Sequence, residues 1–171
     1  HLNLAADVAT EGTVLLKNDG TLPLSGPCKI ALFGRGAGSG FLFGGGGSGT
    51  LYTTGRVSLS EGLKNAGFEI YQPLVDFYTD FVDKETAEKR AAGGTVLTHW
   101  MRGYDRPEPV ITDELYNGAK SFSKIALYCL PRHSSEGTDF GDRDTGKGGF
   151  CLYDEEAALL DRLCKDFEKV I

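Results

Sequence analysis

The chain has 171 residues, a formal net charge of -6 and 40% apolar residues, which suits one globular domain with its own core. Its basic residues form no run, which argues against a surface for nucleic acid or for an anionic membrane. No apolar stretch approaches the ~20 residues of a membrane helix, and the first residues lack the pattern of a signal peptide.

The cysteines are spaced for neither metal binding nor disulfide exchange. None of the four belongs to a C-x-x-C pair, and Cys129 and Cys164 lie within apolar patterns where a thiol behaves as a small hydrophobe. We therefore expect no metal and no cofactor. A reduced, cytoplasmic compartment is the expectation, although an additional N-terminal segment would leave secretion open.

The first part of the chain alternates helix and strand patterns. Residues 2–9, "LNLAADVA", place Leu2 and three alanines on one helical face and predict a helix. Residues 29–33, "KIALF", form a continuous apolar run that ends in glycine, which is typical of a strand buried on both faces of a parallel sheet. A loop follows this strand.

The next segment predicts a helix and a second strand. In "SLSEGLKNAGFEIY", Ser60 is a candidate N-cap, Leu63 and Ala66 are expected to face the core, and Gly67 ends the helix. Residues 68–71 then read as a strand. Residues 75–92 have apolar residues at helical spacing, while residues 93–111 are punctuated by glycine and proline and predict irregular structure.

The last part of the chain repeats the alternation. Thr112 or Asp113 is expected to cap a helix that leads into a strand at residues 124–130. Asp154 is expected to cap the final helix, whose inward face is predicted to comprise Leu160, Leu163, Cys164 and Phe167. The last residues, "VI", would start another strand, so we expect the sequence to end within an element.

Strands alternating with helices predict a mostly parallel sheet between two helical layers, a three-layer α/β/α sandwich with a flavodoxin-like arrangement. Residues 1–171 are expected to form this one domain. In such sheets ligands bind outside the carboxyl ends of the strands. The loops at residues 34–56 and 131–150 both leave strands at that end, so we expect the functional residues there.

The glycine-rich loop contains a literal G-x-G-x-x-G match at Gly44, Gly46 and Gly49. In a dinucleotide fingerprint the glycines follow the strand at once and open a helix, whereas about ten residues intervene here. The alternative is that the glycines allow close backbone approach to another part of the protein. We favour the second interpretation.

The second loop, "PRHSSEGTDFGDR", carries a lone carboxylate, Glu136, between small polar residues. On the residues alone, we favour a solvated acidic turn, in which Arg143 is a local partner of Glu136 and the aspartates after it, over a catalytic carboxylate. Their spacing does not match a calcium loop. No G-x-S-x-G nucleophile elbow is present.

Longer stretches resemble one enzyme family. "ATEGTVLLKNDGTLPL" is similar to the start of the second, α/β-sandwich domain of glycoside hydrolase family 3, and "KIALFG", "GGGGSG" and "SLSEGLKNAGFEI" follow in the family's order. "SSEGTDFGDR" followed by "LYDEEAALL" resembles its acid-bearing loop and next helix. The resemblance is weakest from about residue 75 to 110. This chain differs from the family pattern by inserting Phe140 and Gly141 before "DR".

The resemblance implies a function for Glu136. In β-glucosidase-like members the matching glutamate is the general acid/base of a retaining glycosidase, and the nucleophilic aspartate lies on a (β/α)₈ barrel for which this chain has no room. The implied partners are that barrel and a β-glucoside or short oligosaccharide. Ser135 and Arg143 become candidates for substrate binding. The alternative is a non-catalytic module that binds carbohydrate or a protein partner.

Overall fold

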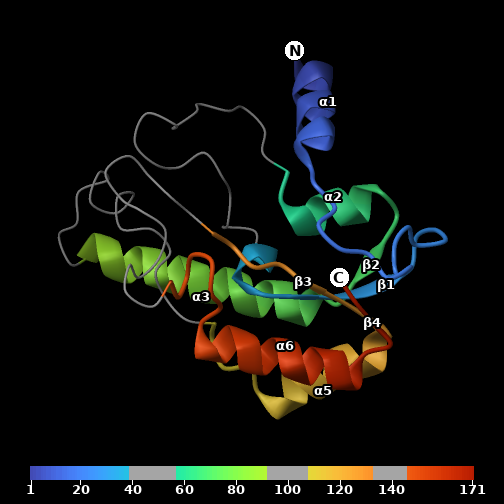
Figure 1. Ribbon diagram of the computed structural model, residues 1–171. Coiled ribbons are helices and arrows are strands. Elements are labelled where there is room, and N and C mark those ends of the chain that lie inside the picture. Colours follow the sequence, from blue (N-terminus) through green and yellow to red (C-terminus); the bar gives the residue numbers. More distant parts are fainter. Residues whose placement is uncertain (39–56, 92–107, 133–145) are drawn as a thin grey trace.

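The computed structural model of the protein describes residues 1–38, 57–91, 108–132 and 146–171 (Figure 1). In chain order the elements are α1 (Leu2–Gly12), β1 (Lys29–Phe33), the 3-10 helix η1 (Arg35–Ala37), α2 (Leu59–Asn65), β2 (Glu69–Ile70), α3 (Gln72–Ala91), α5 (Asp113–Phe122), β3 (Ile125–Tyr128), α6 (Asp154–Asp166) and β4 (Lys169–Val170). Strand β1 therefore matches the strand predicted at residues 29–33, and β3 lies within the strand predicted at residues 124–130.

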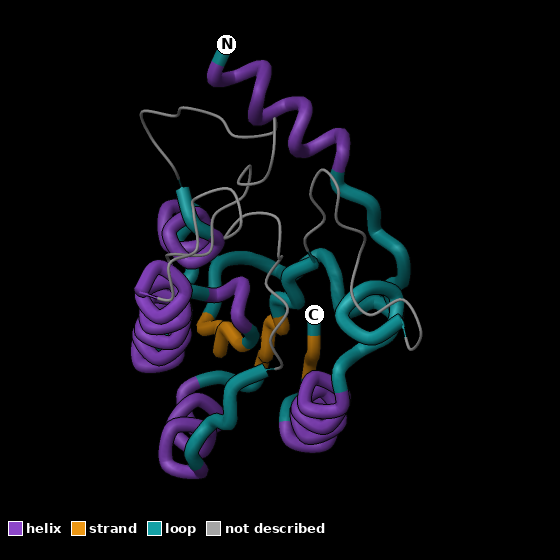
Figure 2. The backbone as a smooth tube through the Cα atoms, turned by 90° about the vertical axis from the view of Figure 1, so that its left-hand side faces the viewer, coloured by secondary structure: helices purple, strands orange, loops and turns teal. Residues whose placement is uncertain are grey.

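The four strands form one parallel sheet in the order β2-β1-β3-β4. This is the order of the first four strands of a flavodoxin-like sheet. Helices α5 and α6 lie on one side of the sheet, and α2 lies on the other (Figures 1 and 2). The predicted α/β sandwich is confirmed.

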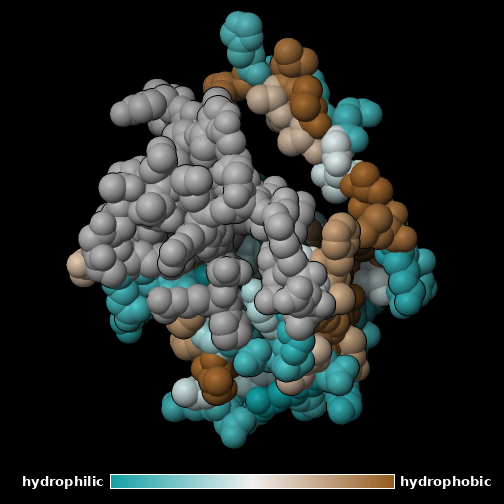
Figure 3. Space-filling model, turned by 60° about the vertical axis from the view of Figure 1, so that its left-hand side comes forward, coloured by the Kyte–Doolittle hydropathy of each residue, from teal (hydrophilic) through white to brown (hydrophobic). Residues whose placement is uncertain are grey.

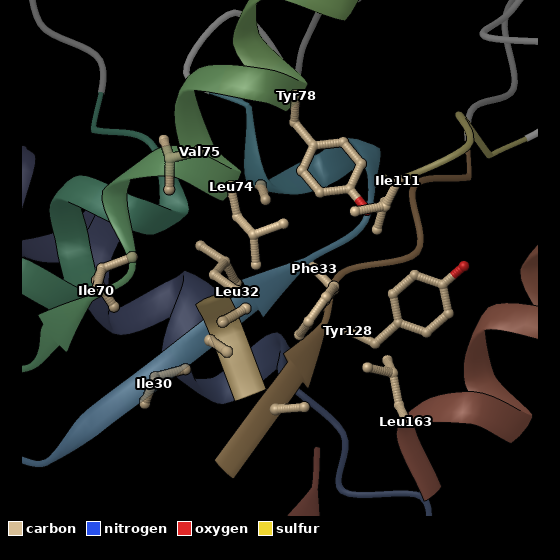
Figure 4. Packing of buried hydrophobic residues seen from close by; sticks show 14 of the residues in the cluster. Ile30, Leu32, Phe33, Ile70, Leu74, Val75, Tyr78, Ile111, Tyr128 and Leu163 are labelled. Carbon is tan, nitrogen blue, oxygen red and sulfur yellow. The ribbon is translucent and has the colours of Figure 1, made fainter. Parts of the chain in front are cut away.

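Strand β1 runs through the centre of the core. Ile30, Ala31, Leu32 and Phe33 are all buried, because neighbouring strands and helices on both faces enclose this strand. Leu74 and Tyr78 of α3 pack toward it (Figure 4). The Phe33 ring also lies 5.6 Å, centroid to centroid, from that of Phe167. A continuous apolar run is what such a strand requires.

The N-cap of helix α2 lies two residues before the predicted one. Ser58 is the N-cap: its hydroxyl accepts from the Glu61 N–H, and the Glu61 carboxylate accepts from the Ser58 N–H at 2.8 Å. Ser60, the predicted cap, lies inside the helix. Gly67 follows the helix end with φ of +91°, as predicted, but Ala66 is exposed and does not face the core.

The predicted N-cap of α5 is confirmed, whereas the predicted N-cap of α6 is wrong. Thr112 caps α5 by accepting from the Leu115 N–H. Asp154 is the first residue of α6, and the N-cap is Tyr153. On the inward face of α6, Leu163 is buried, whereas Cys164 is exposed and does not join the core.

Helix α1 forms as predicted but has no buried residue. Apolar side chains gather along it and along the segment that follows, as the space-filling view shows (Figure 3). Within the described ranges, no helix has the combination of length and apolarity that crossing a bilayer would require. All four cysteines are free.

Candidate functional site

The predicted site residues Ser135, Glu136 and Arg143 lie outside the described residues, as do Gly44, Gly46 and Gly49 of the glycine-rich loop. The structure describes the residues on either side of both loops. The candidate site is therefore built from the carboxyl edge of the sheet, where these loops begin and end.

The carboxyl ends of β1 and β3 lie side by side. Phe33 pairs with Tyr128, and the Cys129 N–H then donates to the Phe33 carbonyl at 2.8 Å. Gly34 follows β1 with φ of +93°, and a Cβ at this position would lie 2.3 Å from the Cys129 carbonyl oxygen. Only glycine fits at this position, where the chain leaves β1 beside the end of β3. The two predicted loops thus start at the same edge of the sheet.

A buried ion pair holds the segment after β1. The Arg35 guanidinium of η1 bonds the Glu85 carboxylate of α3 at 2.5 Å, and the two side chains are only 2% and 3% exposed. The guanidinium also lies over the Phe81 ring, 5.7 Å from its centroid. This pair connects the carboxyl edge of the sheet to α3.

A second buried carboxylate, Glu108, lies beside this pair. Its Oε1 accepts from the Tyr78 hydroxyl at 2.6 Å, and the Arg35 backbone N–H also donates to it. Burial raises the pKa of Glu108 to about 7, although the Tyr78 hydrogen bond and the Arg35 charge oppose the rise. The second oxygen, Oε2, has no hydrogen-bond partner among the described residues. The side chain is therefore partly protonated near neutral pH.

Two tyrosine hydroxyls and a cysteine thiol near Glu108 are also shielded from water. Burial, followed by the charge of Glu108, raises the pKa of the Tyr78 and Tyr128 hydroxyls and of the Cys129 thiol. Both effects favour the neutral thiol, so Cys129 does not have the character of a thiolate nucleophile. Sequence reasoning missed this cluster, because Glu108 stands between two prolines in a segment expected to be irregular.

A second arginine, Arg132, lies directly before residues 133–145. Its Nη1 and Nη2 donate to the two oxygens of Glu156 at 2.8 and 2.7 Å. Its Nε donates to the Gly149 carbonyl at 3.1 Å, and Nη1 also donates to the Pro131 carbonyl at 2.9 Å. Because Gly149 and Glu156 follow residues 133–145, this guanidinium joins the chain before that segment to the chain after it.

The chain after residues 133–145 returns through a tight turn into α6. The Cys151 N–H donates to the Gly146 carbonyl at 2.9 Å, and the Gly148 N–H donates to the Cys151 carbonyl at 3.0 Å. Gly146 and Gly148 have φ of +67° and +75°, which only glycine adopts readily. Lys147 in this turn pairs with Asp154 of α6 at 2.7 Å.

No group of three or more histidine, cysteine or acidic residues suited to a metal occurs in the part of the chain that the structure describes. The described chemistry at this edge is instead a buried carboxyl group, Glu108, whose pKa responds to the charges of Arg35 and Glu156. Such an arrangement fixes the backbone of a site. It does not supply an exposed nucleophile.

The fold and this edge define the class of the chain as a flavodoxin-like α/β domain with loops at the carboxyl ends of its strands. The chain belongs to glycoside hydrolase family 3, because the model of the Glycosyl hydrolase family 3 C-terminal domain matches residues 13–171. The resemblance identified from the sequence is confirmed.

Two curated relatives are both β-glucosidases. Beta-glucosidase A from Butyrivibrio fibrisolvens is 32% identical over 142 residues, which cover 81% of this chain and 16% of that protein. A beta-glucosidase from Ruminococcus albus is 28% identical over an alignment of 172 residues that covers all of this chain and 17% of that protein. The chain therefore spans about a sixth of the length of these relatives.

Solved structures show the same relationship. Beta-glucosidase 3B from Thermotoga neapolitana, in complex with alpha-D-glucose, superimposes with a TM-score of 0.77 at 27% identity, covering 98% of this chain and 22% of that one. A beta-glucosidase from Paenibacillus barengoltzii gives a TM-score of 0.77 at 26% identity, covering 98% of this chain and 17% of that one.

Proposed function

We propose that this domain supplies the general acid/base of a retaining β-glucosidase and that Glu136 is that residue. The observation that carries the proposal is the family match over residues 13–171, which includes the loop "SSEGTDFGDR". The names of the relatives support a β-linked glucoside or a short oligosaccharide as the substrate. Ser135 and Arg143 are the proposed substrate contacts on the same loop.

The proposed chemistry divides the reaction between two carboxyl groups. An aspartate on a (β/α)₈ barrel of the same protein attacks the anomeric carbon, while Glu136 donates its proton to the departing oxygen. Glu136, now a carboxylate, then takes a proton from the water that hydrolyses the glycosyl–enzyme intermediate. The domain thus contributes half of a site that the barrel completes.

Glu108 is not a competing candidate for this role. Its pKa of about 7 would suit a general acid, but its side chain is only 5% exposed and is bonded to Tyr78. An acid must lie within about 3 Å of the oxygen that it protonates. A carboxyl group enclosed by the core cannot contact a sugar.

The substitution Glu136→Gln in the barrel-containing protein tests the proposed role. Loss of a general acid should lower kcat/KM by about 10²- to 10⁴-fold for alkyl β-glucosides, whose leaving groups need protonation. Glycosylation by 2,4-dinitrophenyl β-glucoside should suffer far less. Glu155→Gln, at an exposed position on α6, is the matched control. Equal losses for both substrates, or no loss, would contradict the role and favour a non-catalytic module.

The division of the site predicts that the 171-residue chain alone does not hydrolyse aryl β-glucosides. A general acid without its nucleophile cannot form the glycosyl–enzyme intermediate. Measurable turnover by rigorously purified chain would contradict the need for a barrel. Addition of the separately produced barrel provides a further measurement, because restored turnover would support the two-domain site.

A further inference from the structure

Residues 133–145 are bounded by one compact set of hydrogen bonds. Arg132, immediately before them, bonds both oxygens of Glu156 and the carbonyl of Gly149, which both come after them. Arg132 is 23% exposed and Glu156 only 4%, so water competes little for the carboxylate. The same guanidinium therefore joins the chain before this segment to the chain after it.

The geometry uses the planar fork of arginine. Two parallel N–H to oxygen bonds orient the guanidinium plane, whereas the ammonium of lysine would make a single point contact. The Glu156 hydrogen bond and charge raise the pKa of Arg132, so the group stays protonated. Glu156 also accepts from the Tyr153 N–H at 3.0 Å and so joins the fork to the first turn of α6.

We infer that Arg132 is a positioning residue for the acid/base glutamate; this inference rests on the proposed function of Glu136. Glu136 follows Arg132 by four residues, so its Cα lies within about 14 Å of the Arg132 Cα. A displacement of about 1 Å at a reacting group costs on the order of 10²-fold in rate. Loss of the two Arg132–Glu156 hydrogen bonds should therefore slow proton transfer by Glu136 even while the domain stays folded.

The positioning role predicts a leaving-group effect in the barrel-containing protein. Arg132→Met should lower kcat/KM for alkyl β-glucosides by on the order of 10²-fold and for 2,4-dinitrophenyl β-glucoside by less than about 10-fold. Arg132→Lys keeps the charge but not the fork, so it should resemble Arg132→Met more than the parent. Lys124→Met is the matched control, because its ion pair with Glu168 is exposed and involves no residue next to the segment. It should leave both rates unchanged.

A double-mutant cycle tests whether the effect passes through the pair. In Glu156→Gln, the amide has one oxygen in place of the two that accept from Arg132, so the paired hydrogen bonds are lost. This variant should therefore show the same loss of kcat/KM as Arg132→Met. The double variant should be no slower than either single variant, because each already removes the fork. Additive losses would overturn the pair as the unit of positioning.

The outcomes separate this inference from the proposed function. A leaving-group effect in Glu136→Gln without one in Arg132→Met overturns the positioning role and leaves the acid/base assignment intact. If Glu136→Gln shows no leaving-group effect, Glu136 is not the acid/base, and Arg132 then has no acid/base residue to position. Equal losses for both substrates in Arg132→Met, accompanied by a lower Tm, would show that the residue serves only the fold.

Discussion

The two arginine–glutamate pairs at the carboxyl edge differ in what they connect. Arg35 and Glu85 are 50 residues apart, are both almost fully buried, and join the end of β1 to α3. Arg132 and Glu156 are 24 residues apart, and the arginine is partly solvated. The first pair belongs to the scaffold, whereas the second bounds the segment that carries the proposed acid/base. Stability and catalysis should therefore respond to different substitutions at the same edge.

Breaking the scaffold pair should have the largest effect on stability. Glu85→Ala leaves the Arg35 charge in the core and should lower the free energy of unfolding by about 3–5 kcal/mol, measured by urea denaturation. The double variant Arg35→Met with Glu85→Met should recover most of that loss, because an apolar replacement leaves no buried charge. A loss below 1 kcal/mol (about the value of an exposed pair) would contradict the scaffold role.

The buried Glu108 should make stability depend on pH. Its pKa is raised from 4.5 to about 7, so the folded state binds the proton more tightly than the unfolded state. Stability is therefore full below pH 4.5, falls as pH rises toward 7, and is constant above that, with a total change of about 3 kcal/mol. Urea denaturation across this range measures the change.

Glu108→Gln is the control for that dependence. The amide oxygen still accepts from the Tyr78 hydroxyl but carries no charge, so this contribution to the pH dependence should disappear. The difference between the two pH profiles isolates Glu108 from the other titrating groups. Parallel profiles for the parent and the variant would show that burial does not raise the pKa of this carboxyl group.

The Arg132–Glu156 pair should contribute less to stability than the scaffold pair. Arg132→Met should lower the free energy of unfolding of the domain by about 1–3 kcal/mol, because the partly solvated arginine is removed while Glu156 keeps its bond from the Tyr153 N–H. The same urea titration measures it. A loss as large as that of Glu85→Ala would erase the distinction between the two pairs.

The smallest effect is expected for the exposed pair in the return turn. Lys147→Met removes the bond to Asp154, but water solvates both groups and screens their attraction. The denaturation midpoint should fall by less than it does for Arg132→Met. A loss equal to that of Arg132→Met would show that the turn as a whole, and not the fork, holds the chain after residues 133–145.

The sequence predicted the elements better than their ends. The run at residues 29–33 predicts a buried strand because every side chain in it tolerates burial, and Leu163 was placed correctly by helical periodicity. Ser58 and Ser60 are both suitable caps by residue type. Only the backbone geometry around Glu61 decides between them.

The buried polar residues were the least predictable part of the site. Arg35 and Glu85 lie in segments whose local patterns do not specify that they meet, and their pairing depends on how α3 packs beside β1. Glu108 has no periodic context at all. Glu136 was proposed only through a family motif, because on the residues alone a lone carboxylate on a polar loop is more typical of a solvated turn.

Azide rescue tests the central claim, that Glu136 is the acid/base, most directly. In the barrel-containing protein with Glu136→Ala, 2,4-dinitrophenyl β-glucoside should still form the glycosyl–enzyme intermediate, whose hydrolysis then lacks a base. Azide needs no deprotonation and should accelerate turnover, releasing β-glucosyl azide with retained configuration. Release of α-glucosyl azide, which would identify Glu136 as the nucleophile, or the absence of any azide effect would contradict the assignment.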